Sequence, residues 1–255
     1  MQTPLKPQPR LTQLLDLTLI QLSNWRWTWR SMVVVSMVTP LLGIAALGIF
    51  ARDAGVEALG YVLTGNLVLS LVFGTLSKVC SNFSFMRMRG MQHYFATLPI
   101  QSSSLVLATT IAFFLLSLPS TVVTLVIGAL YLGLRVRLSP LLLLVLPLAA
   151  SSLSGIGAII GTRSRSPEEG DAISMLVSLG LVGLGPVMAP PERLPGFLVA
   201  LGAFSPATYA ASALRQTLLG PVTSRLPLDL AALGFFALIT LGWVSRKMNW
   251  RESDR

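Results

Sequence analysis

Charged residues are scarce in this chain. Asp, Glu, Lys and Arg make up 11% of its 255 residues, whereas soluble domains carry about a quarter. A surface that faces water cannot be covered with so few charges, and the mean hydropathy of +0.72 points the same way. The composition excludes an ordinary soluble globular protein. It predicts an all-α integral membrane protein, and the lack of repeats and linkers predicts one domain over residues 1–255.

Lysine, histidine and cysteine are scarcer still, and each shortage excludes a kind of chemistry. The three lysines stand outside any Gly-Lys-Ser/Thr sequence, so the chain lacks that phosphate-binding loop for ATP. A single histidine, His93, and a single cysteine, Cys80, cannot assemble a common zinc site. The ten acidic residues avoid the middle of the apolar runs, where ion-coupled carriers keep their charges. We expect no catalytic residue, metal or cofactor in this chain.

Long apolar runs are abundant instead. A hydrocarbon core about 30 Å thick needs roughly 20 apolar residues in a helix. Six runs meet that requirement and predict six transmembrane helices: Met32–Phe50, Ala58–Val79, Leu105 to the residue before Arg135, Pro140–Gly161, Ala172–Met188 and Leu228–Val244.

The basic residues set the expected orientation. Placing both termini in the cytoplasm leaves six of the 19 basic residues outside, and the other 13 inside, in agreement with the positive-inside rule. The net charge of +9 therefore indicates membrane topology and contact with anionic lipids rather than nucleic acid. The six outside residues are Arg52, Arg135, Arg137, Arg193, Arg215 and Arg225.

Residues 11–30 are apolar on one side only. Leu11, Leu14, Leu15, Thr18 and Leu22 recur at helical spacing, and a tryptophan- and arginine-rich segment follows them. This pattern predicts an amphipathic helix on the cytoplasmic surface, leading into the first span.

Residues 194–219 are apolar but interrupted. Pro206 disfavours a continuous helix, and neither half is long enough to cross. Counting the whole stretch as one crossing would also move the C-terminal arginines outside. A re-entrant hairpin that enters and leaves on the outer side is the better interpretation, with a pair of surface helices as the alternative.

Small residues mark a close helix contact in the fourth run. Gly157 and Gly161 form a Gly-x-x-x-Gly pair, which is typical of packed membrane helices. The pair can pack within the subunit or against a second copy.

Residues 86–100, MRMRGMQHYFATLPI, interrupt the apolar pattern between the second and third spans. The gap is longer than a simple turn requires. It mixes arginines with Met, Tyr and Phe, as surface-bound or partner-bound helices do.

Here the sequence resembles the type-2 ABC exporter permeases. The family has an arginine- and glycine-containing segment followed by Leu-Pro-Ile or Thr-Pro-Ile, as in Arg87–Ile100. It also has a proline-rich loop, then Pro-x-x-Tyr, Leu-Arg and Leu-Gly, matched by Pro190–Pro195, Pro206–Tyr209, Leu214-Arg215 and Leu219-Gly220. The order of spans matches over nearly the whole chain. Met88 and Gln92 stand where many members carry glutamate, which leaves the ATPase partner open.

The resemblance implies a permease subunit for an amphiphilic cargo such as a lipid, a lipid-linked glycan or a drug. It implies a bacterial inner membrane or related organelle membrane, a second permease copy as a homodimer, and two ATPase subunits that hold the ATP. A cytoplasmic coupling helix would contact the ATPase, and the hairpin would gate the outer mouth. The coupling residues are Arg87, Arg89, Gly90, His93, Tyr94, Phe95, Leu98 and Pro99, and the gate residues are Leu194, Pro195, Phe204, Pro206, Tyr209 and Arg215. A membrane scaffold or assembly factor, or a secondary carrier, is the alternative.

Overall fold

The computed structural model describes residues 9–25, 28–53, 55–91 and 101–247, and this part of the chain contains helices and no strand. The elements are α1 (Arg10–Asn24), α2 (Trp29–Arg52), α3 (Val56–Leu71), η1 (Val72–Ser77), α4 (Lys78–Met88), α6 (Ser102–Leu132), α7 (Leu142–Arg163), α8 (Pro167–Gly183), η2 (Pro191–Arg193), α9 (Gly196–Gly202), α10 (Pro206–Leu218) and α11 (Leu226–Lys247).

Five helical segments of the described chain are long and apolar enough to cross a membrane: Trp29–Arg52, Val56–Met88, Ser102–Leu132, Leu142–Arg163 and Leu226–Lys247. A sixth is obtained if α9 and α10, which meet at a bend of 89°, are counted as one crossing. These segments coincide with five of the six apolar runs in the sequence. The all-helical, multi-pass character predicted from composition is therefore confirmed.

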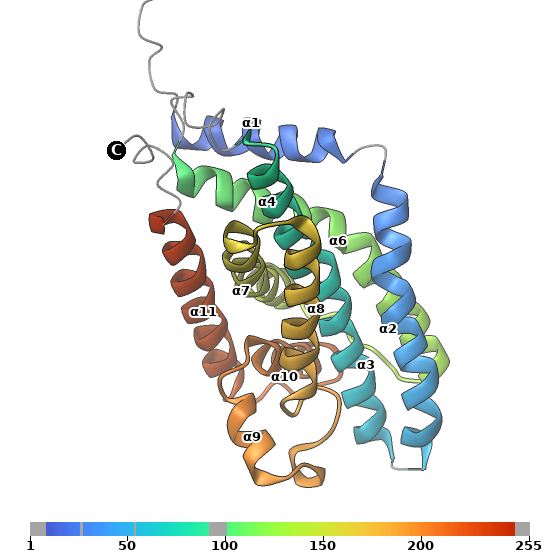
Figure 1. Cartoon of the computed structure of the whole chain (residues 1–255). Coiled ribbons are helices and arrows are strands. Elements are labelled where there is room, and N and C mark those ends of the chain that lie inside the picture. The colour runs from blue at the N-terminus through green and yellow to red at the C-terminus, as the bar shows by residue number, and fades with distance from the viewer. Residues whose placement is uncertain (1–8, 26–27, 54, 92–100, 248–255) are drawn as a thin grey trace, which may run out of the picture.

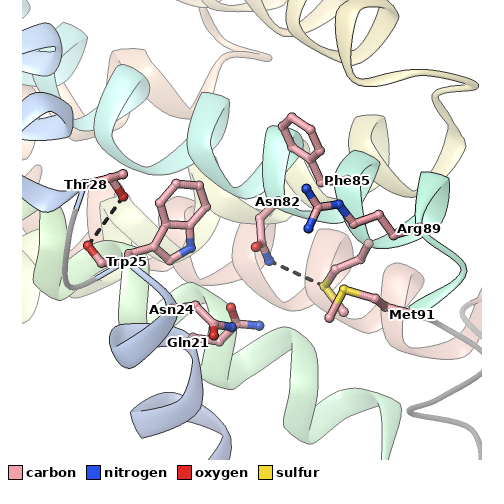
Figure 2. Close-up of a pocket in the computed structure, with 9 residues that line it drawn as sticks. Gln21, Asn24, Trp25, Thr28, Asn82, Phe85, Arg89 and Met91 are labelled. Carbon is pink, nitrogen blue, oxygen red and sulfur yellow. Dashed lines mark hydrogen bonds between the residues drawn. The ribbon is translucent and has the colours of Figure 1, made fainter.

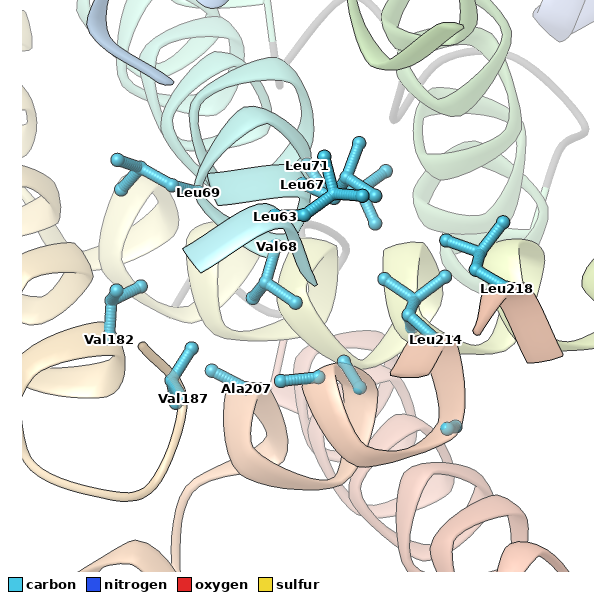
Figure 3. Close-up of a cluster of buried hydrophobic side chains, with 14 of the residues drawn as sticks. Leu63, Leu67, Val68, Leu69, Leu71, Val182, Val187, Ala207, Leu214 and Leu218 are labelled. Carbon is cyan, nitrogen blue, oxygen red and sulfur yellow. The ribbon is translucent and has the colours of Figure 1, made fainter. Parts of the chain in front are cut away.

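The segment Val56–Met88, formed by α3, η1 and α4 and called the central helix below, forms the middle of the fold. In its most apolar stretch 94% of the residues are buried, against 22% in α2 and 28% in α11. Figure 3 shows side chains of α3 facing α10, with Val182 and Val187 beside them. The other long helices pack around the central helix and keep an exposed apolar face, as expected for helices that contact lipid.

The central helix and α7 approach each other closely because the contact is made by glycines. A Cβ atom on Gly157 would collide with the backbone carbonyl of Leu76, and one on Gly161 with that of Cys80. Both contacts are between segments of the same chain. On the neighbouring face of α7, Gly155 lies against Thr240 of α11.

The helices line up so that the bundle has two distinct ends (Figure 1). The α1 end holds α1, the last turn of α4, the first turn of α8 and the last turn of α11. The α10 end holds α9, α10, the start of α3 and the start of α11. α8 runs between the two ends, beside the central helix.

α1 is a helix across one end of the bundle. The predicted surface helix continued to residue 30, whereas α1 ends at Asn24, and Trp29 and Arg30 already belong to α2. The residues it buries are Gln13, Leu17, Thr18 and Gln21. Gln21 donates a hydrogen bond from Nε2 to Oγ1 of Thr109 in α6, at 3.3 Å. The predicted apolar face is divided by the bundle: Leu11 and Leu15 are 76% and 64% exposed, whereas Leu14 packs against the core and Thr18 is buried.

The predicted fifth span is displaced along the chain. The hydropathy of residues 172–188 suggested a helix there, whereas α8 covers Pro167–Gly183. Ser166 and Pro167 provide a helix start that hydropathy does not detect. At the other end Gly185, with φ of +157°, and Pro186 stop the helix before residue 188. With 17 residues, α8 is about 26 Å long.

Candidate functional site

The predicted coupling residues begin at the last turn of α4, at the α1 end. Met86–Met88 complete α4 and do not start a new helix. The chain then turns at Gly90, which has φ of +64° and donates its N–H to the carbonyl of Arg87 at 3.1 Å. Glycine suits this left-handed position at a helix C-terminus. His93, Tyr94, Phe95, Leu98 and Pro99 lie outside the described residues.

Arg87 ties the end of the central helix to the α7–α8 connection. Its Nη1 donates hydrogen bonds to the carbonyl oxygens of Thr162 and Ser164, each at 3.1 Å. A guanidinium is well suited to these carbonyls because the last turn of a helix leaves them unpaired and carries partial negative charge. The sequence suggested an outward-facing partner contact for Arg87, and the structure places its side chain in this contact within the chain.

Arg89 faces a different neighbourhood, beside a cavity of about 420 Å³ between α1 and α4. Its guanidinium carbon lies 6.0 Å from the centre of the Phe85 ring. Figure 2 shows the guanidinium extending past Phe85 toward Asn82, with Trp25, which follows α1, on the opposite side of the cavity. Arg87 and Arg89 are thus exposed side chains that contact different parts of the chain.

The start of α8 is a feature that hydropathy missed. The Ser166 side chain accepts a hydrogen bond from the backbone N–H of Glu169 at 3.2 Å, and Oε2 of Glu169 accepts one from the N–H of Arg165 at 2.7 Å. The Ser166 hydroxyl also lowers the pKa of the Glu168 carboxyl by hydrogen bonding. The sequence Ser-Pro-Glu-Glu carries the signal for this capped helix start.

The predicted gate residues gather at the α10 end. The chain breaks between α9 and α10 at residues 203–205, so the interruption expected at Pro206 is found. Ser205 donates a hydrogen bond to the carbonyl of Leu181 at 2.9 Å, and the Tyr209 hydroxyl donates one to the carbonyl of Ala203 at 2.8 Å. Together these bonds fix the bend and attach it to α8.

Three gate residues lie at or near the surface, and one carries an exposed aromatic ring. Leu194 follows η2 and is half-buried, and the exposed Pro195 precedes α9. Phe204, in the bend, is 79% exposed. Pro206 and Tyr209 lie on the bundle side of the bend, where Tyr209 faces Phe236 of α11 at 6.2 Å between ring centres. The gate residues therefore occupy one region without forming a single cluster.

Arg215 joins α10 to the central helix. Its guanidinium carbon lies 3.4 Å from the centre of the Tyr61 ring, and its Nε and Nη2 atoms are buried with no hydrogen-bond partner among the described residues. A cation over a ring gains most where water is excluded. This contact is the tightest of the arginine–aromatic pairs found in the described chain.

A buried carboxylate next to this region was not among the predicted site residues. Asp229, at the start of α11, is 1% exposed. Its Oδ2 accepts hydrogen bonds from Ser212 at 2.6 Å and Gln216 at 2.9 Å, while Arg225 lies 3.8 Å from Oδ1. The Arg225–Asp229 spacing of four residues was the available signal. The carboxylate fixes the end of α10 to α11.

A comparison with protein-family models gives a match. No curated protein matches the chain. The family model described as "ABC-2 type transporter" matches residues 12–219, a range that runs from α1 to the end of α10. This range covers most of the chain and includes both groups of predicted site residues. The protein belongs to the ABC-2 type transporter family.

Proposed function

We propose that this chain is the permease subunit of an ATP-driven exporter for an amphiphilic cargo, driven by a separate ATPase subunit. The observation that carries the proposal is the family match over residues 12–219. It agrees with a chain that has several membrane-crossing helices and no Gly-Lys-Ser/Thr loop for ATP. The cargo class, a lipid, lipid-linked glycan or drug, comes from the resemblance alone.

In this proposal the α1 end faces the cytoplasm and the ATPase. The end of α11 lies at the α1 end together with α1 (Figure 1). Among the described residues, eight basic residues belong to segments that begin or end there, against six toward the α10 end. The eight are Arg10, Arg30, Arg87, Arg89, Arg163, Arg165, Arg246 and Lys247. This asymmetry supports an orientation with both termini inside. α8 then provides the fifth crossing, and α9 with α10 forms a re-entrant hairpin on the outer side.

In this proposal the central helix transmits movement from the ATPase side of the membrane to the outer side. Arg87 lies at one end of it, and Tyr61, which holds Arg215, lies near the other. With 33 residues the central helix is about 50 Å long. A displacement of residues 86–100 by the ATPase would act directly on α4, on the end of α7 and on the connection from α7 to α8, because Arg87 links these three at one point. The far end of the same helix would then move against α10.

Opening of the pathway at the outer side would require the Arg215–Tyr61 contact and the bend at residues 203–205 to rearrange. Both join the hairpin to the rest of the bundle, through α3 and α8. A second copy of the chain would complete the pathway, and two ATPase subunits would lie beneath the pair.

The test is purification of the protein from its native membrane in mild detergent, with identification of what accompanies it by mass spectrometry. We expect an ATP-binding subunit in an amount similar to that of the permease. The double variant Arg87→Glu/Arg89→Glu should lose that subunit and lose cargo transport. Arg52→Glu is the matched control, because Arg52 is an exposed arginine next to an aromatic ring, Tyr131, at the opposite end of the bundle.

Two results would contradict the proposal. If no ATP-binding subunit accompanies the wild-type protein where other membrane complexes survive, a scaffold or secondary carrier becomes the better explanation. If the ATPase is present but the double variant retains both association and transport, the permease function stands and the coupling role of Arg87 and Arg89 is wrong.

A further inference from the structure

The cavity between α1 and α4 has properties that the transport mechanism does not use. Its volume of about 420 Å³ lies within the range of small-molecule sites. The residues that line it are Gln21, Asn24, Trp25, Thr28, Asn82, Phe85, Met86, Arg89 and Met91. They come from α1 and the connection that follows it, and from α4 and the turn after it, so the cavity is a gap between two elements.

Hydrogen-bond donors and a positive charge face this cavity, and no acidic side chain is among the residues that line it. The indole Nε1 of Trp25 is buried and has no hydrogen-bond partner in the described chain. The Asn82 amide donates only to the thioether of Met86, a weak acceptor, at 3.6 Å. Arg89 adds a guanidinium that contacts the Phe85 ring and forms no hydrogen bond or ion pair within the described part of the chain. Such a set of groups favours an anion with several acceptor oxygens.

The walls of the cavity are apolar and the Trp25 ring is held in place. Phe85, Met86 and Met91 contribute apolar surface. The Trp25 ring meets Phe113 of α6 edge to face, with 5.8 Å between ring centres. The site can therefore accept a charged head and an adjoining apolar portion at the same time, which is the chemistry of an amphiphile.

The position of the cavity identifies the source of that amphiphile. It adjoins α1, whose residues Leu11, Leu15 and Leu19 are 76%, 64% and 62% exposed. A helix that turns its leucines away from the protein lies with them in the headgroup and acyl boundary of a bilayer. The cavity on the other flank of this helix then opens at the depth of the lipid phosphates.

We propose that this cavity is a binding site for the phosphate headgroup of an anionic phospholipid, held by Arg89 and the Trp25 indole N–H. The lipid would fill the gap between α1 and α4 and join the surface helix to the end of the central helix. The site is a property of the single chain, so it does not depend on the ATPase partner.

The test is native mass spectrometry of the full-length protein in detergent, titrated with phosphatidylglycerol or with phosphatidylcholine of the same acyl chains. We expect the wild type to retain phosphatidylglycerol preferentially. Arg89→Gln should weaken that retention about tenfold, the effect of losing one strong charge-assisted hydrogen bond. Trp25→Phe keeps the ring against Phe113 and removes the N–H, so its effect should be smaller but in the same direction.

Arg163→Gln is the matched control. Arg163 is also a basic residue at the α1 end with an aromatic neighbour, at 4.4 Å from the Trp243 ring centre, but it does not line the cavity. The control should bind phosphatidylglycerol like the wild type. Equal losses in Arg163→Gln and Arg89→Gln would mean diffuse attraction to the membrane surface and would overturn the proposal.

Three further results would also overturn it. The first is a wild-type protein that shows no preference for phosphatidylglycerol. The second is competition by inorganic phosphate as effective as that of the lipid, which would indicate a site for a soluble anion. The third is displacement of the lipid by the purified ATPase subunit together with loss of ATPase binding in Trp25→Phe, which would assign the cavity to the partner protein.

Discussion

Arginine joins elements at both ends of the central helix, but the two contacts are physically different. At the α10 end the guanidinium of Arg215 lies on the Tyr61 ring at 3.4 Å, and two of its nitrogens are buried. At the α1 end Arg87 is exposed and reaches two backbone carbonyls at 3.1 Å. Both contacts connect the same helix to its neighbours.

The difference separates a closed contact from an accessible one. Breaking the Arg215 contact leaves a charge in a place that water does not reach, which is costly. Breaking the Arg87 contact exposes groups that water can hydrate at once. The α10 end therefore has a closed contact, and the α1 end has an accessible one.

The largest expected loss of stability comes from a substitution at the contact between α7 and the central helix. It tests whether these helices join the two ends of the bundle into one packed unit. Gly157→Leu would force a side chain against the Leu76 carbonyl, and a backbone atom cannot move aside cheaply. We expect a loss of about 3 kcal/mol of stability and poor recovery of folded protein, measured by thermal unfolding in detergent. Gly234→Leu in α11, where a Cβ has no neighbour within 4 Å, is the control. An equal loss of thermal stability in Gly157→Leu and Gly234→Leu would mean that α7 does not pack against the central helix as described.

The next largest effect measures the closed contact directly. Tyr61→Leu removes the ring and leaves the Arg215 guanidinium buried without it, so we expect a substantial loss of stability. In a protein that already carries Arg215→Met, Tyr61→Leu should lower the free energy of unfolding by about 2 kcal/mol less than in the wild type. This difference is the size of a desolvated cation–π contact.

The pair Arg52 and Tyr131 is the comparison for this cycle. Its ring distance is 5.4 Å and both residues are exposed. We expect a coupling energy of about 0.5 kcal/mol there. Equal coupling energies in the two pairs would remove the distinction between a closed and an accessible end.

Hydropathy predicts the membrane segments well because the lipid imposes their length. Five apolar runs coincide with helices, and the break at Pro206 follows from the geometry of proline. Hydropathy does not show which helix is central. α2 and the central helix both contain a strongly apolar stretch, yet 22% of the residues in the stretch of α2 and 94% of those in the stretch of the central helix are buried. Lipid and a protein interior are equally apolar, so the hydropathy of a residue does not indicate whether its side chain faces lipid or protein.

The details of the candidate site depend on contacts between distant parts of the chain. The partners of Arg87 lie 75 and 77 residues away, and Arg215 and Tyr61 come from separate helices. α1 buries Gln13 and Gln21 against the protein, which its hydropathy pattern does not indicate. The π-helical turn η1 has no local signature that hydropathy could detect. Pairings of this kind are set by the packing of the whole fold.

A smaller effect is expected at the accessible end. Arg87→Gln should lower stability by about 1 kcal/mol, because the two lost hydrogen bonds are partly replaced by water. Hydrogen exchange should increase at the end of α7 and the start of α8. Arg89→Gln is the control and should leave this exchange unchanged, because no hydrogen bond joins Arg89 to either element in the described chain. Faster hydrogen exchange in both variants would show that the positive charge of the arginines, and not the contact of Arg87 with the carbonyls, stabilises the α7–α8 connection.

The smallest effect concerns the first turn of α8, which follows the Ser164 carbonyl that Arg87 contacts. Ser166→Ala removes the acceptor for the Glu169 N–H and should lower stability by about 0.5 kcal/mol, near the lower limit for helix caps because the site is exposed. Ser166→Asp keeps an acceptor at the same position and should restore the loss. Hydrogen exchange of the Glu169 amide measures both. If Ser166→Ala also accelerates exchange near Tyr61, the two ends of the central helix are coupled through α8 even without the ATPase. Confinement of the change to the first turn of α8 would show that the accessible end can loosen while the closed end stays shut, as an externally driven permease requires.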